Sequence, residues 1–172
     1  MDIEKIILII IGAFVGFFAS VLKDYFVEKT KRKYKEIELK REKVEELYIL
    51  LESWANLFFS QKNHLTLVMQ EHISFNDYLD YIIEGGDKNK QDFKRIDMLI
   101  NIYFKELSVH HKKIIEQMGV VNDIQFQYKQ NYQNGNINGE EYIEPLLSET
   151  LKVTKLVDKL KENIVVLVNN IK

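Results

Sequence analysis

The sequence of 172 residues contains no cysteine, a single proline and only seven glycines. The absence of cysteine excludes a disulfide framework, thiolate zinc sites and thiol catalysis. The scarcity of glycine and proline leaves too few turn signals for a sandwich or barrel of many short strands. Basic and acidic residues nearly balance, at 24 and 26. The overall charge therefore does not indicate a protein that binds nucleic acid.

Common catalytic and metal-binding motifs are missing as well. The chain has no phosphate-binding glycine loop, no G-x-S-x-G elbow and no H-E-x-x-H pair. His110 and His111 are adjacent, so on a helix they point about 100° apart and cannot bind one ion from one face. We therefore expect no metal site and no cofactor. His110 follows the apolar spacing of its segment, which predicts a hydrogen-bonded histidine in the core.

What the sequence does contain is one long apolar run near its start. Residues 6–22 read IILIIIGAFVGFFASVL, between Lys5 and Lys23, with no charged residue. As a helix the run is about 25 Å long, at the short end of what crosses a hydrocarbon core of about 30 Å. A buried core helix and a signal peptide are the alternatives, but the first five residues are net acidic and no cleavage site is evident. The run predicts one transmembrane helix, within residues 1–27.

A basic cluster follows the apolar run and sets the expected orientation. Five basic residues occur within seven positions: Lys29, Lys31, Arg32, Lys33 and Lys35. Basic flanks remain in the cytoplasm, which predicts a single-pass protein of the bacterial inner membrane with its amino terminus outside and its carboxy-terminal domain cytoplasmic. Next to a bilayer, the cluster would bind anionic lipid headgroups. Residues 44–172 carry a net charge of −5, so direct nucleic-acid binding is not expected.

Small residues recur every fourth position within the apolar run. Gly12, Gly16 and Ser20 drift only about 80° around a helix and form one shallow stripe. Such a stripe lets two helix backbones approach closely. It predicts self-association of the chain into a homo-oligomer.

The remainder of the chain has helical patterning. No glycine or proline occurs between Phe17 and Glu84, so the first helix is expected to continue through a charged stalk, residues 28–43, into the following domain. In residues 44–68 the apolar positions keep the 3–4 spacing of an amphipathic helix: Val44, Leu47, Leu51, Trp54, Phe58, Leu65 and Val68. Ser74 and Asp77 form a candidate capping box for a short helix that Gly85 and Gly86 would close.

Two further helices complete the expected fold. Asp87 would cap a long helix whose apolar face runs from Phe93 past Leu107 and His110 to Tyr128. Residues 131–139 predict a loop, and the last helix is expected from about Tyr142, with Pro145 in its first turn. The predicted fold is all-α, with one transmembrane helix (1–27) continuing through the stalk (28–43) into a cytosolic antiparallel bundle (44–172).

The helical domain resembles the HEPN ribonucleases, which carry Arg and His with four to six residues between them. None of the three arginines stands at that distance before a histidine. The closest approach is Lys105-Glu-Leu-Ser-Val-His110, in which lysine replaces arginine and lacks its planar fork. The candidate pair Lys105 and His110 is thus degenerate, and no enzymatic activity is expected.

The layout as a whole resembles the small accessory membrane proteins of type VI-B CRISPR systems. The shared features are one amino-terminal span, a basic junction, a HEPN-like domain without a good catalytic motif, and the length. The resemblance implies a ring-like homo-oligomer, a membrane pore, a role in antiphage defence and an RNA-guided effector as partner. The residues themselves leave two other functions open: a membrane-tethered adaptor that recruits a cytosolic partner, and a HEPN-type nuclease.

Overall fold

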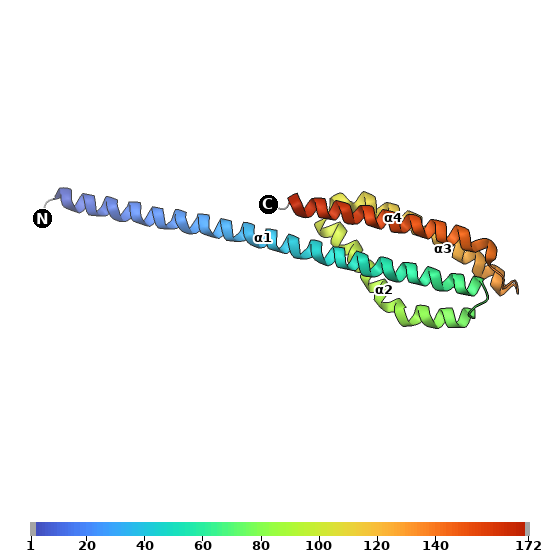
Figure 1. Cartoon of the computed structure of the whole chain (residues 1–172). Coiled ribbons are helices and arrows are strands. Elements are labelled where there is room, and N and C mark those ends of the chain that lie inside the picture. The colour runs from blue at the N-terminus through green and yellow to red at the C-terminus, as the bar shows by residue number, and fades with distance from the viewer. Residues whose placement is uncertain (1–2, 171–172) are drawn as a thin grey trace. The chain divides into compact units, whose positions relative to one another are not determined.

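The computed structural model of the protein describes residues 3–170, with the side chains of all of these except residues 4–11, 13, 15 and 85–89. Within this range the chain forms four α-helices and a short 3-10 turn, and no strand. In chain order they are α1 (Ile3–Met69), α2 (Phe75–Tyr103), the turn η1 (Lys105–Leu107), α3 (Ser108–Gln133) and α4 (Glu140–Asn170) (Figure 1). The predicted all-α class is confirmed.

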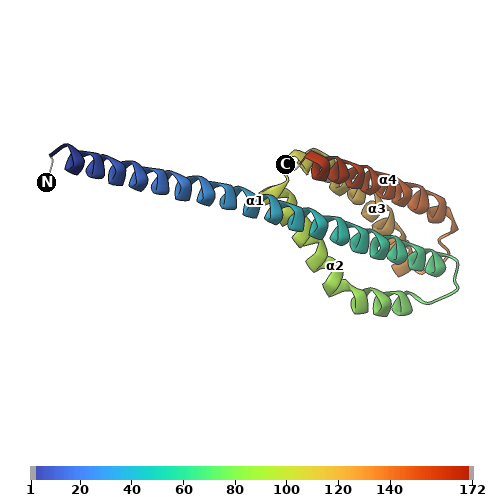
Figure 2. The ribbon, with the colours of Figure 1, turned by 60° about the vertical axis from the view of Figure 1, so that its left-hand side comes forward.

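The chain divides into two compact units, residues 1–41 and residues 42–172, and α1 contributes to both. Within the second unit, the rest of α1 and helices α2, α3 and α4 run side by side and reverse direction at each connection (Figures 1 and 2). The bundle that these helices form is therefore antiparallel, as the sequence predicts.

The apolar stripe of α1 builds the centre of this bundle. All seven residues predicted from the 3–4 spacing are buried: Val44, Leu47, Leu51, Trp54, Phe58, Leu65 and Val68. They lie on one side of the helix because four residues advance little more than one turn. The aromatic members also pack together, with the rings of Trp54 and Phe58 stacked at 5.3 Å and Phe93 of α2 at the same distance from Trp54.

The start of α2 is confirmed, whereas its predicted end is wrong. The Ser74 hydroxyl accepts a hydrogen bond from the backbone N–H of Asp77, and the Asp77 carboxylate accepts one from the N–H of Ser74. The helix then continues through Gly85 and Gly86 to Tyr103 instead of closing there. Two glycines cost a helix about 1 kcal/mol each. Burial of Tyr78 on one side and Ile96 on the other offsets that cost.

The expected long helix from Asp87 to Tyr128 is interrupted at Phe104, where the chain reverses. Phe104 has φ −134° and ψ 51°, and the three residues of η1 follow it. Neither glycine nor proline marks the place. The side chains of Phe104 and Leu107 are only 3% and 2% exposed, so the bend directs both into the core. Tertiary burial therefore overrides the helical pattern at this position.

The loop between α3 and α4 is shorter than predicted, because α3 extends to Gln133 and α4 begins at Glu140. Gly139 joins this loop to the end of α1. Its N–H donates to the carbonyl of Met69 at 3.0 Å, and its own carbonyl accepts from the N–H of Tyr142 at 2.9 Å. A Cβ atom at Gly139 would lie 2.5 Å from the Tyr128 ring and 2.7 Å from Met69 Cγ. Only glycine fits this approach of two backbones.

The stripe predicted for α4 is confirmed over its described length. Leu146, Val153, Val157, Leu160 and Ile164 are buried, and Leu167 packs against them; Ile171 lies outside the described residues. Because α4 begins at Glu140, Pro145 lies in the second helical turn and not in the first. The hydrogen bond that its missing N–H would make to residue 141 is therefore lost.

The predicted transmembrane helix is wrong. In the part of the chain that the structure describes, no helix has enough length and apolar character to cross a bilayer. The apolar run between Lys5 and Lys23 provides about 25 Å of helix, short of a core of about 30 Å. Its residues 6–11, 13 and 15 are outside those whose side chains are described. The single-pass topology, the inner-membrane location and the membrane pore depended on this span, and they are corrected with it.

Candidate functional site

The first unit presents an apolar helix surface to its surroundings. Every described side chain from residue 12 to residue 36 is exposed. Eight of those between residues 14 and 27 are large and apolar, with exposed fractions between 43% and 65%: Phe14, Phe17, Phe18, Val21, Leu22, Tyr25, Phe26 and Val27. Burying a side chain such as Phe or Leu contributes about 1.5–3 kcal/mol. A contiguous exposed set of this kind is a marker of an interaction surface.

The predicted small-residue stripe lies on this same helix and is uncovered. A Cβ atom built at Gly12 or Gly16 would have no heavy atom within 4 Å, and Ser20 is exposed. On the other side of the helix, the rings of Phe14 and Phe18 stack at 6.3 Å. The helix therefore has a shallow face and a bulky face, which are the two surfaces that close helix packing needs.

The basic cluster follows on α1 and is fully exposed, with only part of its charge engaged. Arg32 donates to the carboxylate of Glu28, one turn earlier, and this bond lowers the pKa of Glu28. Lys29, Lys31, Lys33 and Lys35 make no ion pair within the described residues. Four ammonium groups thus remain available to an acidic surface.

The two residues proposed as a degenerate nuclease pair lie on different elements. Lys105 opens η1 and is exposed, whereas His110 lies in the first turn of α3 and is half-buried. No hydrogen bond or ion pair joins them in the described structure, and the buried Nδ1 atom of His110 has no hydrogen-bond partner there. Lys105 and His110 thus lie near the same bend, but they do not contact each other through a hydrogen bond or an ion pair in the described structure.

The core histidine is His111, and the prediction that placed His110 in this role is wrong. His111 is 4% exposed and packs against Phe93, with ring centroids 5.6 Å apart. Burial lowers its pKa, although Asp97, whose Oδ1 lies 3.7 Å from His111 Nδ1, acts in the opposite direction. Both histidines satisfy a 3–4 spacing from Ile114. The bend at Phe104 sets the phase of α3 and selects His111.

Sequence reasoning missed a buried lysine. Lys62 is 5% exposed, and its Nζ donates to Gln125 Oε1 at 2.6 Å and lies 4.9 Å from the centre of the Phe58 ring. No carboxylate pairs with it in the described structure, and burial lowers its pKa to about 8. The burial of Lys62 could have been predicted from the spacing, because residue 62 lies one turn after Phe58 and three residues before Leu65 on the apolar stripe.

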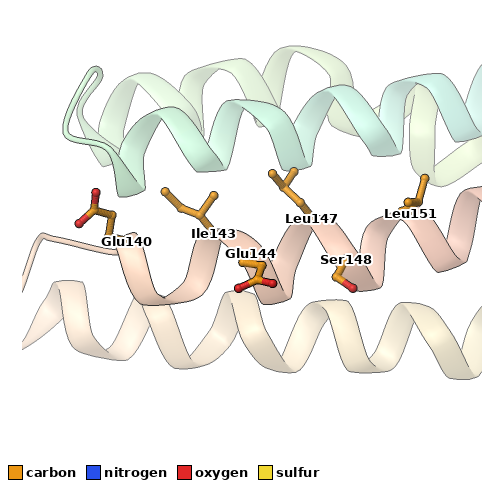
Figure 3. Close-up of a pocket in the computed structure, with 6 residues that line it drawn as sticks. All are labelled: Glu140, Ile143, Glu144, Leu147, Ser148 and Leu151. Atoms are coloured by element: carbon orange, nitrogen blue, oxygen red, sulfur yellow. The ribbon is translucent and has the colours of Figure 1, made fainter.

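A shallow groove runs along the exposed side of α4, which we call the α4 groove. Its volume is about 620 Å³, and its lining comes from a single face of the helix: Glu140, Ile143, Glu144, Leu147, Ser148 and Leu151. Figure 3 shows Ile143, Leu147 and Leu151 in a row along one edge of this face, and Glu144 and Ser148 along its opposite edge. Neither Glu140 nor Glu144 is ion-paired within the described residues. The groove thus combines aliphatic surface with two free carboxylates.

No group of histidine, cysteine, aspartate and glutamate residues suited to a metal ion occurs in the described part of the chain. The sequence matches no protein-family model and no curated protein, and the structure matches no solved structure. The HEPN-like character and the resemblance to type VI-B accessory proteins therefore stay predictions. The features of the structure that indicate a function are therefore its interaction surfaces: the exposed apolar surface, the basic cluster and the α4 groove.

Proposed function

We propose that this protein is a non-catalytic helical adaptor that self-associates through its first unit and binds a protein partner through its second. The exposed apolar surface of residues 12–27 carries this proposal. Eight large apolar side chains on one helix remain exposed, and covering them is the strongest driving force available to the molecule. A second copy of the chain has the same apolar surface, so self-association can cover it without another protein.

The shallow stripe gives this association its geometry. Open space around Gly12 and Gly16 allows another helix to approach within backbone contact. The bulky aromatic side chains on the Phe14 side of the helix can pack into the shallow face of another copy. A contact between these two different faces repeats from copy to copy, and it closes a ring where the rotation between copies permits.

Bulkier residues in the stripe should reduce the size of the assembly. We expect Gly12→Leu/Gly16→Leu to lower the mass of the purified full chain, measured by sedimentation velocity against the monomer mass of 20.5 kDa. Gly119→Leu is the matched control, since a Cβ atom at this exposed glycine of α3 also meets nothing within 4 Å. An assembly of unchanged mass in the double variant would contradict the proposal.

The absence of catalysis is tested separately. Lys105 and His110 share no contact, so the purified chain should leave single-stranded RNA intact over hours. Cleavage that disappears in His110→Ala, while the folded fraction by circular dichroism stays constant, would instead favour the nuclease alternative.

The resemblance in layout indicates which partner to examine first. We expect the second unit to bind an RNA-guided effector of the type VI-B class, and a pull-down with purified effector measures it. The support for this partner is the predicted HEPN-like character of the helical domain and its degenerate pair in the sequence, together with the acidic second unit.

A further inference from the structure

The α4 groove carries two carboxylates in a fixed spacing. Glu140 and Glu144 are one helical turn apart, both are exposed, and neither is ion-paired in the described structure. Residues four apart on a helix lie about 6 Å from each other. Next to them the aliphatic residues Ile143 and Leu147 continue the same face.

The basic cluster of α1 offers the complementary arrangement. Lys31 and Lys35 are also one turn apart and exposed, and neither is ion-paired in the described residues. Val27 and Tyr34 share their helix face, with exposed fractions of 43% and 68%. Lys29 and Lys33 lie on the other side of the helix, since each is two positions away.

We propose that the α4 groove of one copy binds residues 27–35 of α1 of a second copy, with the two helices antiparallel. Lys35 then lies beside Glu140, Lys31 beside Glu144, and Val27 beside Ser148, next to Leu147. The proposal deepens the self-association argued above and rests on it, because it identifies a second contact between copies. It is a helix-in-groove interaction in which aliphatic contacts provide area and the charges set the register.

The antiparallel direction follows from the residues that flank the charges. A parallel docking that pairs Lys31 with Glu140 and Lys35 with Glu144 would place the carboxylate of Glu38 over Leu147. The antiparallel register places Glu28 there instead, and the carboxylate of Glu28 already pairs with Arg32 of the same helix. Covering a carboxylate that an arginine balances costs less free energy than desolvating Glu38, which makes no ion pair in the described residues.

Long-range charge supports the same pairing. Residues 1–41 contain nine basic and six acidic residues, whereas residues 42–172 contain 15 basic and 20 acidic residues. The two units of different copies therefore attract each other. Because the groove and the basic segment are different surfaces, each copy keeps one of each available, and the contact extends from copy to copy.

Charge reversal on either side should weaken the contact, and mixing the two reversed chains should restore it. The groove variant is Glu140→Lys/Glu144→Lys, and the segment variant is Lys31→Glu/Lys35→Glu. In either variant alone, groove and segment carry the same sign. We expect self-association of each to weaken on the order of tenfold, and the equimolar mixture to recover the wild-type mass because both of its groove–segment combinations are again of opposite sign.

Two control variants apply the same charge changes elsewhere on the same helices. Lys29→Glu/Lys33→Glu reverses the opposite side of the basic segment, and Asp158→Lys/Glu162→Lys reverses an exposed pair on α4 outside the groove. Both should retain nearly wild-type mass. Loss of association in the controls equal to that in the test variants, or a mixture that stays dissociated, would overturn the proposal.

Cross-linking then identifies the contact itself. The chain has no cysteine, so a chain with Val27→Cys can be mixed with a chain of different tag length carrying Ser148→Cys, and a product that joins both tags must be intermolecular. We expect rapid disulfide formation for this pair and little for Lys29→Cys with Ser148→Cys. If the chain assembles without this cross-link, whether the groove is empty or holds another protein, the docking is refuted while self-association stands. If the chain is monomeric, both fail.

Discussion

At the scale of single residues, Lys62 is an energetically unfavourable group in the second unit. An ammonium group removed from water without a carboxylate partner costs several kcal/mol unless it loses its proton. The protein relieves part of this cost with one amide oxygen, from Gln125, and with the face of the Phe58 ring. The network continues from the Gln125 amide to the hydroxyl of Tyr78 at 3.2 Å. Polar groups therefore connect α1, α2 and α3 inside the bundle.

Lys62 should make the folded state more stable as the pH rises. Its pKa is about 8 in the fold and about 10.4 in an unfolded chain. Between these values the unfolded state binds more protons, so stability increases with pH. From pH 7 to pH 9.5 the gain is about 2 kcal/mol. Lys62→Met should be more stable than wild type at pH 7 and should lack this increase, as measured by urea unfolding at both pH values.

Lys159→Met, an exposed lysine of α4, is the control and should retain the wild-type increase. The upper limit of pH 9.5 avoids the tyrosines, because burial raises the pKa of Tyr78 and Tyr128 to about 12. Above pH 10 these two tyrosines ionise first in the unfolded state and lower the stability. An equal increase with pH in Lys62→Met would show that Lys62 is not the group responsible.

At the scale of elements, the connection between α3 and α4 depends on one residue without a side chain. Gly139→Ala forces a Cβ atom against the Tyr128 ring and Met69, and it disturbs the hydrogen bond to the Met69 carbonyl. We expect it to lower the free energy of unfolding by about 1–3 kcal/mol, as overpacking in a tight site does. Gly119→Ala, in open space within α3, should instead raise it by about 0.5–1 kcal/mol. Urea unfolding of both variants by circular dichroism measures the contrast.

The elements that could be predicted from the sequence are those whose signal is local. The stripes of α1 and α4 follow from periodicity alone, and the capping box at Ser74 and Asp77 has its own sequence pattern. The reversal at Phe104 has no local signal, since its cause is burial among distant residues. For the same reason the pattern could not choose between His110 and His111, which differ only in phase.

Candidate sites were less predictable than elements. The basic cluster and the small-residue stripe could be recognised because each is a run of one residue type at helical spacing. The α4 groove could not be recognised, because Ile143 and Leu147 resemble core residues in the sequence and only the packing of the bundle leaves them half-exposed. The burial of Lys62 was likewise visible only as a charged residue at a core position.

At the scale of the whole molecule, α1 belongs to two units that differ in how much tertiary packing stabilises the helix. The described side chains of α1 in the first unit are exposed apart from the half-buried Ile37, whereas the part of α1 in the second unit is packed into the bundle. An isolated helix is only marginally stable in water, and packing provides most helical stability in proteins. The two parts of α1 should therefore open independently.

Hydrogen exchange should locate this difference within a single helix. In dilute solution, where copies are apart, amides of residues 28–41 should exchange at least about tenfold faster than those of residues 47–65, because local opening of the first segment breaks no tertiary contact. Mass spectrometry of peptic peptides measures both segments in one sample, with an unfolded chain as reference. Equal protection along the whole of α1 would show that its first segment is stabilised by contacts in the monomer.

The reversal at Phe104 has a consequence for fragments of the chain. Its bent backbone is maintained by the burial of Phe104 and Leu107, and no residue of the joint prefers a turn by itself. A peptide that contains the end of α2 and the start of α3 but none of their neighbours lacks those burial sites, and its intrinsic preferences favour one straight helix. The direction of the chain here is thus a property of the finished bundle and not of the segment that bends.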